Sequence, residues 1–271
     1  MKSILLPVDQ SEQMPSALET GWLLANQCEA TLEGVPLRPA FSGIVAADPI
    51  VAVFPPADWN EAEYSRSMRQ TFDVFAAGHP TSQGSGARFR WRGGSPIEDG
   101  ALGSLARVHD ITVLSRPGSR GARTTAFEAA LFDSGRPVLM APPQPPKTLG
   151  ERILIHWNAS TETARTILVA MPILRKAKQV SLIAVEGHIV PGPSVKEAVA
   201  HLQANGIPTT DKTVTPTGSR PGEAILAEAG AVGADLLIKG AYTQSRLRQM
   251  IFGGATRHIL SAAELPVLFA H

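Results

Sequence analysis

The sequence predicts an α/β protein made of two tandem, doubly wound domains, each with a mostly parallel sheet. Three observations support this prediction. Short apolar runs of strand length alternate with segments of helical periodicity, the runs are apolar throughout, and the whole pattern occurs twice. Continuous apolar strands are typical of parallel sheets that helices cover on both faces.

The repeat is clearest at the start of each copy. The apolar run 4–8 leads into Asp9, and the apolar run 153–155 leads through His156 and Trp157 into Asn158, with a serine two residues after Asp9 and Asn158. Equivalent residues of the two copies are 149 positions apart at Ser11 and Ser160, 125 apart at Asp110 and Asp235, and 129 apart at Pro137 and Pro266. The first copy therefore has 24 additional residues early, and the second has four additional residues late.

In the first copy, Phe89 and Trp91 alternate with arginines, which is typical of an edge strand with one solvated face. Residues 36–60 contain five prolines, and we expect a surface excursion without regular structure there. The expected strands are 4–8, 32–37, 88–92, 111–114 and 137–141, and the expected helices are 11–27, 59–77 and 97–108.

The second copy follows a proline-rich joint, so we expect domains at 1–141 and 151–271 with a linker at 142–150. Ser194 follows a Pro-Gly-Pro sequence and is expected to cap a helix. The expected strands are 153–155, 180–185, 212–216, 236–238 and 266–270, and the expected helices are 194–204, 222–232 and one that passes through Ile259 and Leu260.

Composition excludes several classes of protein. A net charge of +1 in 271 residues gives no general attraction to nucleic acid or to an anionic membrane. The single Cys28 allows no disulfide framework within the chain, and we expect it to be buried and inert. No signal-peptide core and no membrane span is evident, so we expect a cytoplasmic protein.

Several kinds of catalytic or metal site are also not indicated. The chain has no Gly-x4-Gly-Lys-Ser/Thr loop, and its seven histidines are not paired at metal-ligand spacing, so no metal site is expected. No Ser-His-Asp arrangement is visible from the sequence. Of the seven histidines, His156 is the one that could face a ligand, because it lies at a strand end. We expect it to contact a ligand or to be structural rather than to act as an acid or base.

Ligands of doubly wound sheets bind beyond the carboxyl ends of the strands. In the second copy, Gly240 follows a strand, and the pair Gly253-Gly254 opens a helix with Thr256 in its first turn. Such glycines let backbone N–H groups approach an anion, and Arg246 adds a cation nearby. This pattern predicts a phosphate-binding cradle. The alternative is a surface loop with a glycine turn and solvated arginines.

These residues resemble the universal stress proteins in their tandem two-domain form. The resemblance implies flavodoxin-like domains, each with a five-stranded sheet in the order 3-2-1-4-5. ATP-binding members of that family carry Gly-x2-Gly-x9-Gly-Ser/Thr after the fourth strand and an Asp after the first. Gly240 and Gly253 match this motif, whereas Thr243 replaces its second glycine and Gly254 replaces its Ser/Thr.

The resemblance implies a nucleotide site in the second copy, where Asn158 replaces the acidic residue. The loop 115–123 of the first copy lacks the glycine spacing, and its arginines are expected to be mostly solvated. The candidate binding residues are His156, Asn158, Val185, Gly240, Ala241, Arg246, Gly253, Gly254, Ala255 and Thr256, with Pro7, Val8, Asp9, Val35 and Arg116 as weaker candidates in the first copy.

The resulting hypothesis is a stress-response protein that binds ATP, another adenine nucleotide or a related small molecule and acts as a regulator rather than an enzyme. One alternative is a structural or protein-interaction module whose nucleotide sites have decayed, and another is a weak ATPase. The strands that end each copy are expected to pair across the two halves or between chains, so a homodimer or an intramolecular pseudo-dimer is expected.

Overall fold

The computed structural model describes residues 1–39, 44–47, 50–53, 57–79, 88–118, 123–216, 220–241 and 254–271. The first half alternates strands and helices. Its strands are β1 (Ser3–Val8), β2 (Thr31–Pro36), β3 (Ile44–Ala47), β4 (Ile50–Val53), β5 (Arg88–Trp91), β6 (Ile111–Ser115) and β7 (Val138–Ala141). Its helices are α1 (Met14–Cys28), α2 (Glu61–Gly78), the short 3-10 helix η1 (Asp99–Ala101), α3 (Leu102–Ala106) and α4 (Thr124–Asp133). Of these elements, α4, β3 and β4 are additions to those that the sequence predicts.

The second half repeats the same alternation without the hairpin. Its strands are β8 (Arg152–His156), β9 (Gln179–Val185), β10 (Thr209–Val214), β11 (Leu236–Gly240) and β12 (Val267–Ala270). Its helices are α5 (Thr161–Leu174), α6 (Val195–Ala204), α7 (Pro221–Ala231) and α8 (Gly254–Ala262). Ser194 caps α6 as expected, in a reciprocal capping box with Glu197.

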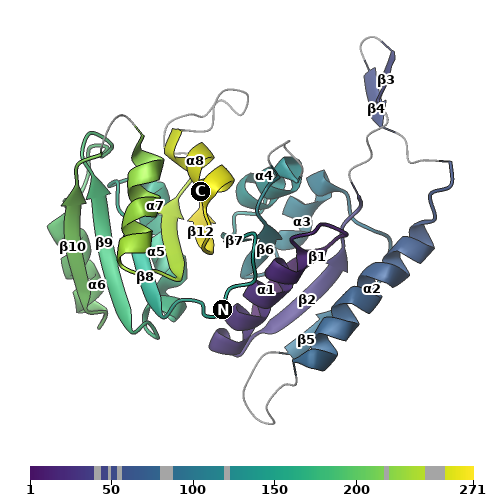
Figure 1. Cartoon of the computed structure of the whole chain (residues 1–271), viewed down its shortest axis with the longest axis horizontal. Helices are drawn as coiled ribbons and strands as arrows, with labels where there is room; N and C mark the ends of the chain where they lie inside the picture. Colours follow the sequence, from purple (N-terminus) through teal and green to yellow (C-terminus); the bar gives the residue numbers. More distant parts are fainter. Residues whose placement is uncertain are drawn as a thin grey trace.

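The two halves share one ten-stranded sheet in the order β10-β9-β8-β11-β12-β7-β6-β1-β2-β5 (Figure 1). Within each half the strands are parallel, and their order is 3-2-1-4-5. The halves join where β7 and β12 pair antiparallel, with Leu268 opposite Leu139. The strands that end the two copies therefore pair with each other inside the chain, and β5 and β10 are outermost.

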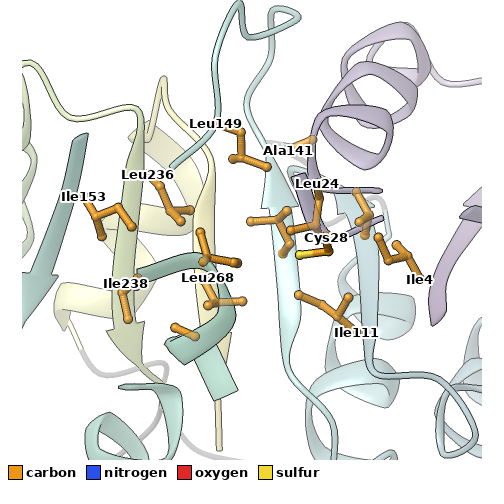
Figure 2. Packing of buried hydrophobic residues seen from close by; sticks show 14 of the residues in the cluster. Ile4, Leu24, Cys28, Ile111, Ala141, Leu149, Ile153, Leu236, Ile238 and Leu268 are labelled. Carbon is orange, nitrogen blue, oxygen red and sulfur yellow. The ribbon is translucent and has the colours of Figure 1, made fainter. Parts of the chain in front are cut away.

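Helices cover both faces of this sheet, which is the doubly wound arrangement. The core on one face packs against α1, α2, α5 and α6, and the core on the other against α3, α4, α7 and α8. The core that α1, α2, α5 and α6 cover is one cluster with members in both halves, and Figure 2 shows Ile153 and Leu268 on one side of the junction and Ile4 and Ile111 on the other. Cys28 is buried in it, and burial raises the pKa of its thiol.

The proline-rich insertion differs from expectation. The sequence predicts irregular chain over 36–60, but β3 and β4 form an antiparallel pair with Ile44 opposite Val53, and this hairpin stands away from the body in Figure 1. The reason is local: the β-branched runs of both strands lie between the prolines, only two residues apart, which favours a hairpin.

The helix expected at 97–108 is also shorter than predicted. Ile97 bridges to Leu37, because its N–H donates to the carbonyl of Pro36 and its carbonyl accepts from Arg38. The first residue of the expected helix, Ile97, is thus hydrogen-bonded to the chain after β2, and helical structure begins only at Asp99. In the described part of the chain, no helix is long and apolar enough to cross a membrane.

Candidate functional site

The candidate site lies at the carboxyl ends of β8 and β11, the first and fourth strands of the second half, where the strand order reverses. His156 ends β8 and is paired in register with Lys239 of β11. Neighbouring residues in register share one face of a sheet, and both are on the face that packs against α7 and α8. Two polar side chains therefore enter the core together at the ligand edge.

Lys239 is buried, with 5% of its surface exposed. Its Nζ donates to Oγ1 of Thr256, at 2.9 Å, and to the carbonyl of Gly240, at 2.8 Å. Thr256 is the third residue of α8 and is itself buried. Burial lowers the pKa of Lys239 to about 8, because desolvation penalises the ammonium ion. The lysine thus connects β11 to the first turn of α8.

His156 is the second polar group of this core. It is 4% exposed, and among the described residues neither ring nitrogen has a hydrogen-bond partner. Burial, and then the charges of Lys239 and His188, lower its pKa to about 3, so the ring is neutral at physiological pH. An unsatisfied buried polar atom is destabilising, typically by about 1–3 kcal/mol, so such a group calls for an explanation.

The first half supplies an internal reference for these three residues. In the repeat, Pro7 is equivalent to His156, Leu114 to Lys239, and Phe127 to Thr256. All three first-half residues are buried and apolar. The same scaffold therefore folds without any polar group at these positions. We call His156, Lys239 and Thr256 the polar trio.

Asn158, which replaces the acidic residue, organises the start of α5. Its Oδ1 accepts from Oγ1 of Thr163, at 2.6 Å, and from the N–H of Ser160, at 3.3 Å. Ser160 in turn caps α5 by accepting from the N–H of Thr163. The role of Asn158 as a ligand-binding residue stays a prediction, and its oxygen already has this structural role.

Gly240 also has a structural reason to be glycine. A Cβ atom built there would lie 2.5 Å from the backbone nitrogen of Thr163 and 2.7 Å from its Oγ1. The first turn of α5 therefore packs directly on the end of β11. The backbone of Ala241 continues the sheet by donating to Ala270, and its side chain is buried. Val185 is fully buried, and its carbonyl accepts from His188, so its side chain contacts the core rather than the surface.

The N-terminus of α8 is the remaining part of the expected cradle. Gly254 is exposed there, Ala255 is half-buried and Thr256 is buried. Arg246, Gly253 and Thr243 lie outside the described residues. Beside this terminus, a groove of about 590 Å³ runs between α7 and α8, and its charged lining residues are cationic. It is lined by Arg220, Pro221, Gly222, Gly254, Arg257, His258 and Ser261.

The corresponding edge of the first half is closed by an internal ion pair. Asp9 is buried, and its Oδ2 is 2.7 Å from Nε of Arg123. Arg123 also contacts Asp99, at 2.9 Å, and donates to the carbonyl of Arg38, at 2.7 Å. The sequence reading of Arg123 as a solvated residue is therefore wrong. The sequence does not predict this cluster, because Arg123 is far from Asp9 and Asp99 along the chain.

The other first-half candidates are part of the packed sheet or of the junction. Val8 and Val35 are buried in the two cores, and Pro7 is buried in β1. Arg116 donates to the carbonyl of Ala263, at 3.0 Å, and to Glu264, at 3.3 Å, so it ties the first half to the loop after α8. Arg120 lies outside the described residues.

The sequence predicts His156 and Thr256 as binding residues, whereas Lys239 is not among its candidates. The available signal was a lysine at the end of the run Leu236-Leu237-Ile238, at a position where the first copy has leucine. In the described ranges, no three His, Cys, Asp or Glu side chains group as they would to hold a metal ion.

Comparison with known proteins finds a family match in the second half. The family model described as the universal stress protein family matches residues 155–271. A 48-residue segment is 33% identical to the stress response protein NhaX of Bacillus subtilis (strain 168); it covers 18% of this chain and 29% of that protein. The chain thus spans less than a third of this curated relative.

Solved structures show a similar fold for the whole chain. A universal stress protein from Archaeoglobus fulgidus DSM 4304 matches with a TM-score of 0.72 and 17% identity, over 98% of this chain and 97% of that one. A protein of unknown function from Pseudomonas aeruginosa PAO1 matches with a TM-score of 0.58 and 13% identity, over 100% of this chain and 92% of that one. The α/β fold with a mostly parallel sheet is that of the universal stress protein neighbours.

Proposed function

We propose that this chain is a tandem universal stress protein whose second half binds an adenine nucleotide and whose role is regulatory rather than catalytic. The observation that carries the proposal is the polar trio. His156, Lys239 and Thr256 occupy the ligand edge of one half, at positions that are apolar in the other half. Because the apolar version also folds, the polar version is explained by a ligand rather than by stability.

The proposed orientation of the nucleotide follows from the electrostatics at the carboxyl ends of β8 and β11. The N-terminus of α8 carries partial positive charge, and Lys239 adds a full charge beneath its first turn. The phosphates therefore face α8. An adenine nucleotide is chosen because Gly240 and Gly253 keep two glycines of the motif that ATP-binding universal stress proteins carry. The match of the second half to that family agrees with this choice.

A regulatory role fits the chemistry of the trio better than turnover. A histidine with a pKa of about 3 is a weak general base, and the trio contains no carboxylate. A route for the output is present at the end of α8, where the carbonyl of Ala263 accepts from Arg116 of the first half. Binding at one end of α8 would thus be felt at the junction of the halves.

The proposal also gives a stoichiometry of one nucleotide per chain. In the first half, Arg123 already supplies the cation at Asp9, and Leu114 and Phe127 fill the positions of Lys239 and Thr256. A ligand there would have to displace an internal ion pair.

The test combines two measurements on the full chain. The purified protein is denatured and its supernatant is analysed for nucleotide, and titration calorimetry then measures binding of ATP, ADP and AMP. We expect one site per chain. Thr256→Phe, which installs the first-half residue, should abolish binding while the protein stays folded. Asp9→Asn, which installs the second-half residue in the first half, is the matched control and should leave binding unchanged. No bound nucleotide and no binding heat would refute the proposal.

A further inference from the structure

We propose that Lys239 selects the ligand by charge, so that the second half favours the more negatively charged phosphate chain. This inference rests on the proposed function and adds a specificity-determining residue to it. Four observations carry it: the missing counter-ion of Lys239, its position under α8, the orphaned imidazole of His156, and the apolar residue at the same position of the first half.

Lys239 has no carboxylate partner among the described residues. Its two hydrogen-bond acceptors, the hydroxyl of Thr256 and the carbonyl of Gly240, are neutral, and burial is the sole cause of its pKa shift. The sequence between β11 and α8, residues 242–253, contains no aspartate or glutamate. Among the described residues, the charge of Lys239 therefore has no compensating anion, which is unfavourable in a protein core.

The position of Lys239 directs this charge at one place. Its Nζ is bonded to the first turn of α8, a helix of nine residues, so the lysine and the helix dipole act on the same approach. His156 lies beside Lys239 in register, and it is neutral and buried, without a hydrogen-bond partner in the described part of the chain. It thus offers both a donor and an acceptor without cancelling the positive charge.

The effect does not require direct contact between Lys239 and the ligand. In a core of low dielectric constant, a unit charge acts strongly over several ångströms. An added phosphate charge at the end of α8 is therefore stabilised in proportion to its size. Neutral adenosine gains nothing from Lys239, AMP gains less than ADP, and ADP gains less than ATP.

The first half shows what the site would be without this selection. Leu114 occupies the position of Lys239, is buried, and packs in the core that α3 and α4 cover. Lys239→Leu therefore restores a side chain that this scaffold already accommodates. Lys178→Leu is the matched control, because it removes one lysine from an exposed position just before β9 begins. This position is at the amino ends of the strands, away from the carboxyl ends where Lys239 lies.

The experiment is titration calorimetry of the full chain with ATP, ADP, AMP, adenosine and inorganic tripolyphosphate. In the unmodified protein, affinity should rise with ligand charge. Lys239→Leu should weaken ATP binding by about tenfold or more, leave adenosine within about twofold, and flatten the series. Lys178→Leu should preserve the series. Lys239→Met is a second variant, and thermal unfolding of each variant checks that it is folded.

The outcomes separate the two proposals. If nucleotides bind with equal affinity, or if Lys239→Leu leaves the series unchanged, charge selection is wrong and nucleotide binding stands. If tripolyphosphate binds in a Lys239-dependent way but nucleotides do not, charge selection stands and the adenine nucleotide is wrong. If none of the five ligands binds, both proposals are overturned.

Discussion

The two halves of this protein differ most where they are built most alike. Both bring the ends of their first and fourth strands together beside the N-terminus of a helix. In the first half, Asp9 and Arg123 neutralise each other there. In the second half, Lys239 is buried without a counter-ion among the described residues. The comparison teaches that one backbone supports either a closed ion pair or an open charge.

The largest expected effect concerns the closed edge. Arg123→Leu leaves the buried Asp9 and the half-buried Asp99 without their shared cation, which should lower the free energy of unfolding by about 3–5 kcal/mol. Urea unfolding measures this loss. Adding Asp9→Asn should restore part of it, because an amide needs no cation.

Arg69→Leu is the control for this prediction. It removes an exposed pair with Asp73 on α2, and the expected loss is below about 1 kcal/mol. If the two arginine variants are equally destabilised, the buried pair of Asp9 and Arg123 contributes no more to stability than an exposed ion pair does.

The next effect is a dependence of stability on acid that arises from His156 in the second half. The pKa of His156 is about 3 in the folded chain and near 6.5 when unfolded, because of burial and the charges of Lys239 and His188. Between these values only the unfolded chain takes up the proton, so stability falls as pH falls, by about 2 kcal/mol at pH 5.

Unfolding free energies at pH 7 and pH 5 test this prediction. His156→Leu should remove that part of the pH dependence, whereas His201→Leu, at an exposed position of α6, should leave it in place. Equal slopes in the two variants would mean that His156 is not the buried titrating group.

A smaller effect is expected from Lys239→Leu in the absence of ligand. At pH 7 the variant should be as stable as the unmodified protein or up to about 2 kcal/mol more stable, because an uncompensated charge is removed while Thr256 and Gly240 lose a donor.

The alkaline range adds a second signature of Lys239. Its pKa is about 8 folded and 10.5 unfolded, so the unfolded chain binds more protons between these values. The stability of the unmodified protein should therefore rise across this window, and that of the variant should not. A loss of several kcal/mol in the variant at pH 7 would assign Lys239 a structural role instead.

The smallest effect tests the connection between the halves. Arg116→Ala removes a hydrogen bond to Ala263 and a contact with the exposed Glu264, so we expect a loss of about 1 kcal/mol in chemical unfolding. It should also reduce the response of the first half to nucleotide, measured by hydrogen exchange at α4. An unchanged exchange response would place the output elsewhere than at Arg116.

The fold could be predicted from the sequence because its signals are local. Apolar runs such as 4–8 and 153–155, with helical periodicity between them, determine the parallel sheet without long-range information. The hairpin of β3 and β4 departs from the prediction because β-branched runs form its strands in spite of the prolines around them.

The site was harder to predict because its interactions are long-range. Asp9 and Arg123 meet only in the folded chain, and a lysine at a strand end gives no indication of burial on its own. Gly240 fits both a nucleotide motif and close packing against α5, so that its identity alone does not distinguish them. The internal repeat was the one signal that could have identified Lys239, through Leu114 at the same position.

The antiparallel pairing of β7 with β12 has a consequence for how the halves evolve and assemble. When two such domains are covalently linked, their association becomes intramolecular, with an effective concentration set by the short connection rather than by protein abundance. Dilution cannot separate them, and each half always has the same neighbour. A domain in this position can lose its own binding chemistry and still be supplied, in every molecule, with a partner that has kept it.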